Sequence, residues 1–295
     1  MISTVLVPVD FSIETEDLLG CIGELKNAGL EKVIFLHVVD IHKSQGLSPM
    51  FERNAEKRIE DYTGFASELE LETEPLVIVG DVKRTISEIA DRKDVDAIIM
   101  GATTEGFIKG KFLGRTTEYI ARSSKKMLLI EKYDALKEGK EVYEKACWAT
   151  FSRVLMPLDF SKESMKAVEQ LQELKEVIKE ALFLHVIDDI KDMDLLDEQR
   201  EEAKEKLRKV KKRLAGIKSK HLVVEGIPSD EIVKLASIED ITLIVLTARG
   251  KGDLMDILLG STAENVLRKT AKPVMIIPAS KEFDGEEWDE GEEYA

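Results

Sequence analysis

Short runs of apolar, largely β-branched residues alternate along this chain with longer amphipathic stretches. Such runs, bounded by turn residues, predict buried strands, and the stretches between them predict helices. In the second half of the chain the predicted strands are 153–158, 181–187, 220–225, 241–247 and 273–277. This alternation is typical of βα units, so we expect an α/β fold built on parallel sheets.

The longest helical stretch, residues 194–214, is densely charged and contains few apolar residues. Glu and Lys recur in it at helical spacing, which predicts a helix with one narrow buried stripe. The apolar residues available for that stripe are Leu195, Leu196, Leu207, Val210 and Leu214.

Two further signals predict where helices begin. Ser161 follows the first strand of the second half and is expected to cap the next helix, as Ser12 does in the first half. Pro228, two residues after Gly226, is expected in the first turn of a helix, where proline is favoured. The first half has Val82 at that place and lacks the signal.

The chain is an internal repeat. Residues 5–12 (VLVPVDFS) recur at 154–161 (VLMPLDFS), and residues 35–40 (FLHVVD) recur at 183–188 (FLHVID). From Gly80 and Gly226 onward the two halves stay in register to the last strand, which indicates a tandem duplication rather than chance. Each copy is predicted to be a doubly wound five-stranded parallel sheet with strand order 3-2-1-4-5.

The repeat divides the chain into two domains of 1–131 and 151–280. Residues 132–150 form a polar linker between them. Residues 281–295 carry eight Asp or Glu against one Lys, about half of the net charge of −15. This segment is predicted to be an acidic disordered tail that favours solubility, with partner binding through Phe283 and Trp288 as the alternative.

Composition excludes several classes of protein. The 295 residues are 43% hydrophobic and 34% charged, and no run approaches the roughly 18 apolar residues of a membrane span. No export signal is recognisable at the start, so we expect a cytoplasmic protein. Cys21 and Cys147 are far apart and are expected to be ordinary small apolar residues. The negative charge argues against nucleic acid as a partner.

A ligand crevice is expected where the strand order reverses, beyond the carboxyl ends of the first and fourth strands of each half. Glycine-bearing segments follow the fourth strands and lead into the fourth helices at 101–116 and 247–262. Glycine lets a phosphate approach backbone N–H groups closely, and the start of a helix adds further donors. A carboxylate after the first strand suits a ribose diol, because it only accepts hydrogen bonds.

These motifs resemble the universal stress protein family, whose adenine-nucleotide-binding members have Gly, two residues, Gly, nine residues, Gly and then Ser or Thr. The resemblance covers both halves and implies a Rossmann-like, adenine nucleotide alpha hydrolase-like fold. It also implies that the aspartate and backbone groups of strands two and four hold the nucleoside. The final strands, 127–131 and 274–278, are then expected to pair into an internal pseudo-dimer, and a homodimer of whole chains is left open.

The candidate nucleotide-binding residues follow from this match. In the second half, the preferred site, they are Pro157, Leu158, Asp159, Val186, Leu246, Thr247, Arg249, Gly250, Gly260, Ser261 and Thr262. In the first half, the weaker site, they are Pro8, Val9, Asp10, Val38, Met100, Gly101, Gly114, Arg115 and Thr116.

Neither half keeps the whole phosphate motif. The second half has Thr247 in place of the first Gly, whereas the first half has Thr104 and Arg115 in place of the second Gly and the Ser. Arg115 could donate a charge-assisted bond instead of the lost hydroxyl. The alternatives are that the glycines are turn residues and that Asp10 and Asp159 cap helices. His37 and His185, at the ends of apolar strands, are expected to be structural.

Motifs of common enzymes are absent from the sequence: it contains no GxxxxGK[ST], GxGxxG, HExxH or GxSxG. The leading hypothesis is therefore a module that binds AMP or ATP and acts as a nucleotide-responsive stress or energy regulator. The alternatives are a nucleotide-free dimerisation scaffold and a weak ATP hydrolase or phosphotransferase. A divalent metal is expected only together with ATP, and no metal site is predicted in the protein itself.

Overall fold

The computed structural model describes residues 2–11, 18–44, 47–103, 113–133, 149–188, 193–214, 216–249 and 259–278. Several sequence predictions fall outside these residues. They concern Ser12, Thr104, Gly250, Cys147, most of the linker and the acidic tail.

Among the described residues, the first half contains five strands and the helices between them. The strands are β1 (Thr4–Pro8), β2 (Lys32–Asp40), β3 (Glu72–Gly80), β4 (Ala97–Thr103) and β5 (Met127–Tyr133). The helices are α2 (Leu19–Asn27), α3 (Ser48–Glu68), α4 (Val82–Arg92) and α5 (Arg115–Ser123).

The second half repeats this order. Its strands are β6 (Arg153–Pro157), β7 (Glu180–Ile187), β8 (Lys218–Glu225), β9 (Leu243–Thr247) and β10 (Val274–Ile277). Its helices are α7 (Lys162–Gln172), α8 (Met193–Arg213), α9 (Pro228–Ile238) and α10 (Ser261–Lys269). Each of the strands predicted from the apolar runs is present, with ends that differ by one or two residues.

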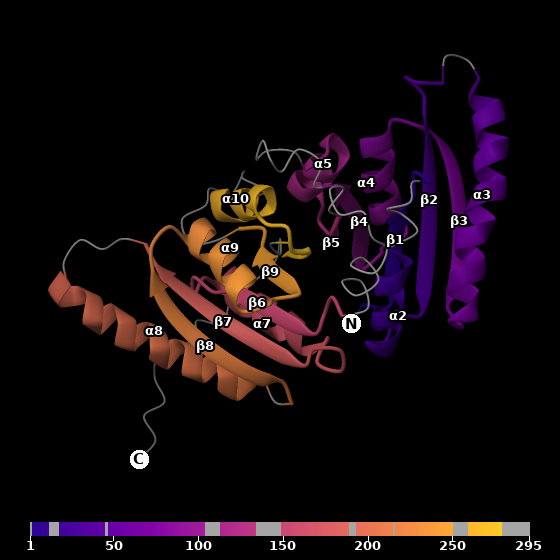
Figure 1. Ribbon diagram of the computed structural model, residues 1–295. Helices are drawn as coiled ribbons and strands as arrows, with labels where there is room; N and C mark the ends of the chain where they lie inside the picture. The colour runs from indigo at the N-terminus through magenta and orange to yellow at the C-terminus, as the bar shows by residue number, and fades with distance from the viewer. Residues whose placement is uncertain are drawn as a thin grey trace.

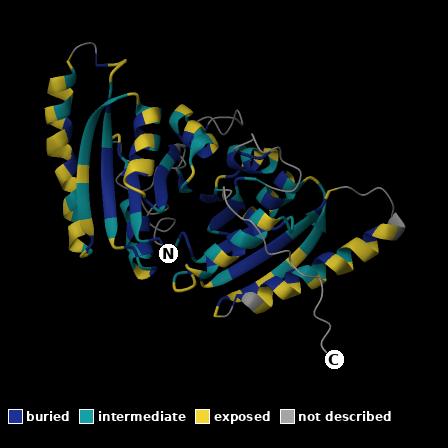
Figure 2. Ribbon diagram, turned by 180° about the vertical axis from the view of Figure 1, so that it is seen from behind, coloured by how far each residue is buried: buried dark blue, intermediate teal, exposed yellow. Residues whose placement is uncertain are grey.

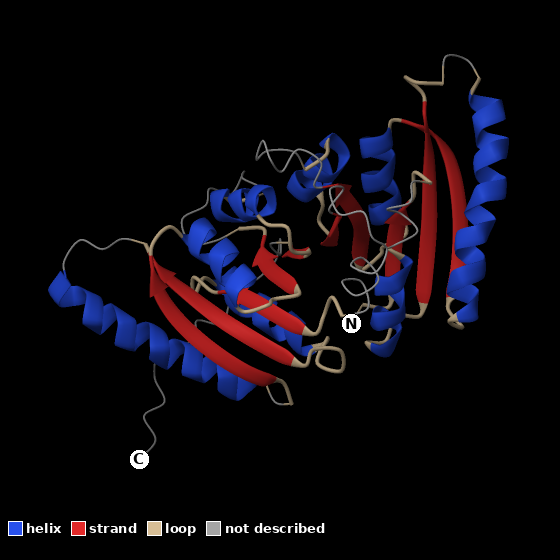
Figure 3. Ribbon diagram, viewed as in Figure 1, coloured by secondary structure: helices blue, strands red, loops and turns tan. Residues whose placement is uncertain are grey.

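All the strands belong to one sheet, in the order β3-β2-β1-β4-β5-β10-β9-β6-β7-β8 (Figures 1 and 3). Each half therefore has the predicted order 3-2-1-4-5, and its strands are parallel. The halves join at the expected final strands. Here β5 and β10 pair antiparallel, with Ile130 opposite Val274 and Leu128 opposite Ile276.

Helices cover both faces of the sheet, so each central strand is buried on both sides (Figure 2). Val5 and Val7 of β1 belong to the core under α2, α3, α7 and α8, whereas Leu6 belongs to the core under α4, α5, α9 and α10. Each core contains residues of both halves. Burial on both faces explains why the sequences of these strands are continuously apolar and do not alternate between apolar and polar residues.

Helix α8 has the predicted narrow stripe, with one correction. Leu196, Leu207, Val210 and Leu214 are buried, but Leu195 is 51% exposed. At the start of the helix, Leu195 lies one position off the buried face, whereas Ala203 completes the stripe at the required spacing. None of the helices in the described part of the chain combines the length and the apolar character needed to cross a membrane.

The helix starts also agree with prediction where they are described. The Ser161 hydroxyl caps α7 by accepting a hydrogen bond from Ser164 N, and Pro228 lies in the first turn of α9. In α4, which lacks the proline, Asp81 is the cap and accepts from Arg84 N at 2.9 Å. The two halves thus start equivalent helices by different means.

Reciprocal ion pairs join the halves where α5 approaches α10. Arg268 of α10 contacts Glu118 of α5 at 2.6 Å, and Arg122 of α5 contacts Glu264 of α10 at the same distance. The arrangement has the symmetry of an isologous interface, in which equivalent residues exchange contacts. Equivalent residues of the two repeats therefore also form equivalent contacts between the two halves.

A second contact, where the linker enters the second half, is buried and polar. Glu131 of β5 is 1% exposed and accepts hydrogen bonds from Cys21 Sγ and Thr150 Oγ1, each at 3.0 Å. Nearby, Glu24 accepts from the backbone N–H groups of Thr150 and Phe151. Cys21 is therefore not the ordinary apolar residue that the sequence suggested, because its thiol is a donor to a buried carboxyl group.

Candidate functional site

The sheet of the second half opens where β6 ends. β6 pairs with β7 along its whole length, from Arg153 to Pro157, but with β9 only at Val154 and Leu155. β7 and β9 continue past it, to Ile187 and Thr247. The carboxyl ends of β7 and β9 are thus separated by an opening that no strand fills. This is the strand-order reversal at which open parallel sheets bind ligands.

A cavity of about 800 Å³ lies at this opening. Its volume is within the range of small-molecule sites, roughly 300–1,000 Å³. The structure brings together at this cavity all the described residues that the sequence singled out for the second half. They are Pro157, Leu158, Asp159, Val186, Leu246, Thr247, Arg249, Gly260, Ser261 and Thr262.

One end of the cavity is rich in hydrogen-bond donors. Helix α10 starts there with Ser261 after the N-cap residue Gly260, and no side chain caps the helix in the described part of the chain. The N–H groups of a first helical turn lack partners within the helix and favour an anion. Arg249 lies at the same cavity, and its buried Nε finds no acceptor among the described residues. This end is therefore suited to a phosphate group.

Asp159 lies between the strand ends and has a local role as well. Its Oδ1 accepts hydrogen bonds from Ser161 N at 3.0 Å and Ser161 Oγ at 2.6 Å. Ser161 in turn caps α7. Asp159 therefore fixes the turn before α7 and also lines the cavity. Both predicted roles of Asp159, at the start of a helix and in contact with a ribose, are compatible with this position.

His185 has a partner that fits a structural role. Its Nδ1 donates to Leu158 O at 2.7 Å, and its ring stacks on Phe160 at 4.5 Å. Burial lowers the pKa of His185 below the ordinary value, which favours a neutral ring with the proton on Nδ1. Phe160 has a φ of 61°, a left-handed conformation that directs its ring onto the histidine.

The first half repeats this arrangement. His37 Nδ1 donates to Val9 O at 2.8 Å and stacks on Phe11, whose φ is 62°. β1 also pairs with β4 only at Val5 and Leu6, so the same opening forms beyond it.

The candidate residues of the first half lie around that opening. Pro8, Val9 and Asp10 end or follow β1, Val38 lies on β2, and Met100 and Gly101 lie on β4. Gly114 is the N-cap residue of α5, followed by Arg115 and Thr116. The φ of Gly114 is 80°, whereas that of Gly260 is −69°, so the two helices start with different backbone geometry.

Sequence reasoning missed one wall of the second-half cavity. Helix α8 contributes Gln199, Glu202, Ala203 and Lys206, and α9 contributes Pro228 and Ile232. The α8 residues are spaced so that they share one helix face. That spacing was visible in the sequence, but nothing there indicated that this face borders the strand ends. Within the described residues, no cluster of three or more His, Cys, Asp or Glu is arranged to hold a metal ion.

Comparison with known proteins agrees with this architecture. The model of the universal stress protein family matches residues 1–132 and 150–278, and the chain belongs to that family. Universal stress protein MJ0577 of Methanocaldococcus jannaschii is 35% identical over 153 residues, which cover 43% of this chain and 94% of that protein. Universal stress protein MJ0531 of the same organism is 31% identical over 171 residues, covering 52% and 96%.

A solved structure matches nearly the whole chain. The universal stress protein from Archaeoglobus fulgidus superposes with a TM-score of 0.69 at 23% identity, covering 95% of this chain and 98% of that one. This similarity concerns the fold. The two curated relatives each match about half of this chain, and the family model matches it twice, which is consistent with a tandem arrangement of two family domains.

Proposed function

We propose that the second half binds an adenine nucleotide, AMP or ATP, in the cavity between β7, β9 and α10, and that the protein acts as a nucleotide-responsive stress or energy regulator. The observation that carries the proposal is Arg249. Its buried Nε lacks an acceptor among the described residues and lies at the same cavity as the uncapped start of α10. Because Arg249 lines the cavity, its guanidinium can donate charge-assisted hydrogen bonds to an anionic ligand there.

The proposed ligand spans the opening of the sheet. Its phosphate lies at Gly260, Ser261 and Thr262, where N–H groups and hydroxyls converge. Its ribose lies at Asp159, and its base reaches the backbone of Val186 and Leu246, whose strands flank the opening. If ATP is the ligand, a divalent cation accompanies the triphosphate.

A thermal-shift titration with AMP, ADP and ATP tests the proposal directly. A nucleotide that binds only the native state at about 100 times its Kd stabilises that state by about 2.7 kcal/mol. For domains of this size such a gain raises Tm by several degrees. Arg249→Gln removes the charge and is expected to reduce the shift. No shift with any of the three nucleotides would favour the nucleotide-free scaffold.

The ribose contact gives a second prediction. Asp159→Asn keeps the shape and one acceptor but removes the charge, so AMP is expected to bind about ten- to a hundredfold more weakly. The 2′-deoxy nucleotide, which lacks one donor, should bind weakly already and lose less. Isothermal titration calorimetry measures both. Unchanged AMP affinity in Asp159→Asn would restrict Asp159 to its contact with Ser161.

Other functions remain alternatives of lower rank. The first half carries Arg115 at the start of α5 where the second half has Ser261, so we rank it as the weaker nucleotide site. A weak ATP hydrolase or phosphotransferase would need a general base, and His185 is a poor one because burial lowers its pKa. A cytoplasmic location and pairing into a homodimer stay predictions.

A further inference from the structure

The acidic segment 281–295 follows a strand that ends beside the second-half cavity. Ala248 joins the end of this strand to the start of α10. Its N–H donates to Ile277 O of β10 at 2.8 Å, and its carbonyl accepts from Gly260 N at 2.7 Å. Ala248, Gly260 and the adjacent Arg249 all line the cavity. The chain therefore leaves β10 at the end of the cavity where we expect the phosphate, which we call the anion end.

The segment is long enough to reach the anion end. Pro278 is the last described residue before it, and Glu282 follows four residues later, at most about 14 Å along an extended chain. Asp284 and Glu286 follow at intervals of two residues, up to about 7 Å each. A group on a short flexible connection has an effective concentration on the order of millimolar at such a site. Contacts too weak to form between separate molecules can therefore form within this chain.

The charges of the segment and of the anion end are complementary. Residues 281–295 carry eight Asp or Glu against one Lys. The anion end offers the Arg249 guanidinium and the N–H groups of the first turn of α10, which no side chain caps in the described part of the chain. Carboxylates accept charge-assisted hydrogen bonds from both kinds of donor, as a phosphate does.

The internal repeat shows that this charge is specific to the second half. In the register that aligns Gly114 with Gly260, residues 281–295 correspond to 135–149, which carry three Lys and three Glu and no net charge. The first half also starts α5 differently, with a φ of 80° at Gly114. Acidic charge thus follows only the half that we prefer as the nucleotide site. Solubility alone does not require this placement, whereas competition for an anion site does.

We propose that the acidic segment 281–295 occupies the anion end of the second-half cavity in the nucleotide-free protein, so that a nucleotide binds by displacing it. The inference rests on the proposed nucleotide function and adds a regulation of that site. If the segment occupies the site for about two-thirds to nine-tenths of the time, the apparent affinity for AMP is about three- to tenfold lower than that of the open site.

Two matched variants of the full chain test this by calorimetry with AMP at low ionic strength. The segment variant carries Glu282→Gln, Asp284→Asn and Glu286→Gln. The control variant carries Glu56→Gln, Glu60→Gln and Asp61→Asn, at exposed positions of α3. The segment variant is expected to bind AMP about three- to tenfold more tightly than the wild type. The control is expected to stay within about twofold, because α3 lies over the opposite edge of the sheet and its charges are screened there (Figure 1).

The melting temperature without nucleotide separates occupation of the site from simple repulsion. Carboxylates that dock on the native state stabilise it, so the segment variant is expected to have a lower Tm than the control variant. If the segment only repelled the nucleotide, removing three of its charges from a chain of net charge −15 would leave Tm unchanged or raise it.

The outcomes separate the inference from the function on which it rests. Equal AMP affinity in the wild type and both variants would show that the segment does not regulate the site, and nucleotide binding would stand. Tighter AMP binding by the segment variant with an unchanged or higher Tm would overturn occupation. A gain that depends on protein concentration would overturn the contact within one chain and assign the site to the segment of a second copy. If AMP binds none of the three proteins, the proposed function fails and the inference fails with it.

Discussion

Glu131→Gln is expected to be more stable than the wild type by about 2–3 kcal/mol at pH 8.5 and to have no such advantage at pH 5. Burial raises the pKa of Glu131 from 4.5 to about 7, against the smaller opposing effect of the hydrogen bonds from Cys21 and Thr150. Such a shift corresponds to roughly 3 kcal/mol between the two protonation states. The substitution keeps the shape of the side chain and removes its titration.

The direction follows from proton linkage. Below pH 4.5 the carboxyl group is protonated in the folded and the unfolded chain, so its burial carries no ionic cost. Between pH 4.5 and about 7 the unfolded chain releases this proton while the folded chain keeps it, and stability falls as pH rises. Above that range the ionised group is buried and the cost is complete.

Urea unfolding at the two pH values measures this difference, with wild type and variant compared at each pH so that other groups cancel. The contribution of Glu24 to the pH dependence does not cancel fully, because the charge of Glu24 acts on Glu131. Burial raises the pKa of Glu24 as well. Glu60→Gln, at an exposed position of α3, is the control and should show no pH-dependent gain. A constant difference between wild type and Glu131→Gln from pH 5 to 8.5 would contradict the prediction.

The fold could be predicted from the sequence because its signals are local or repeated. The apolar runs are continuous since both faces of the sheet are covered, and the recurrence of residues 5–12 at 154–161 shows that one domain occurs twice. Strand order within each half followed from the class of fold. The pairing of β5 with β10 came from the family resemblance together with the need to cover two apolar edges.

The residues that the sequence did not predict are those whose role depends on three-dimensional proximity. Glu202 looks like any other charge on a solvated helix until the structure places its turn of α8 beside the end of β7. Cys21 and Glu131 are far apart in the chain, and no spacing rule connects a thiol on α2 with a carboxyl group on β5.

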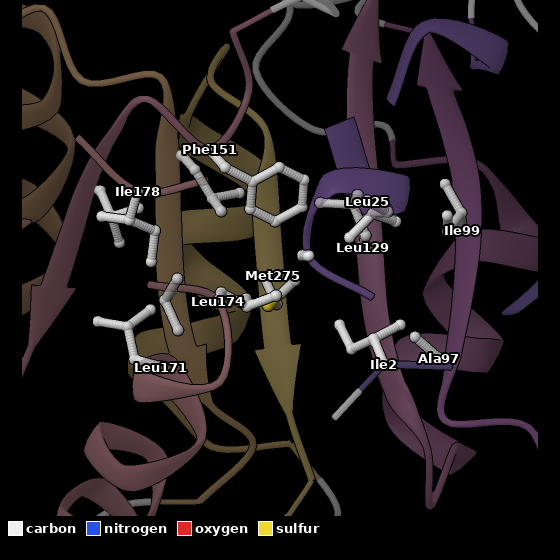
Figure 4. Packing of buried hydrophobic residues seen from close by; sticks show 14 of the residues in the cluster. Ile2, Leu25, Ala97, Ile99, Leu129, Phe151, Leu171, Leu174, Ile178 and Met275 are labelled. Carbon is white, nitrogen blue, oxygen red and sulfur yellow. The ribbon is translucent and has the colours of Figure 1, made fainter. Parts of the chain in front are cut away.

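The contact region between the two halves also contains one of the largest fully buried side chains. Phe151 is fully buried, and its ring points from the second half toward Leu25 and Leu129 of the first (Figure 4). Phe151→Ala is expected to lower the free energy of unfolding by about 3–5 kcal/mol, from lost apolar burial and the cavity left behind.

The control is Phe51→Ala, because Phe51 is 42% exposed on α3 and its truncation should cost less than about 1 kcal/mol. Urea denaturation followed by circular dichroism compares the two. The backbone N–H of Phe151 donates to Glu24, and truncation of the side chain leaves that bond in place, so the measured loss reports packing. Since the core under α2 and α7 is shared by both halves, the loss is expected as a lower midpoint for the whole chain. A biphasic transition in which only one half is weakened would show that the shared core does not couple them.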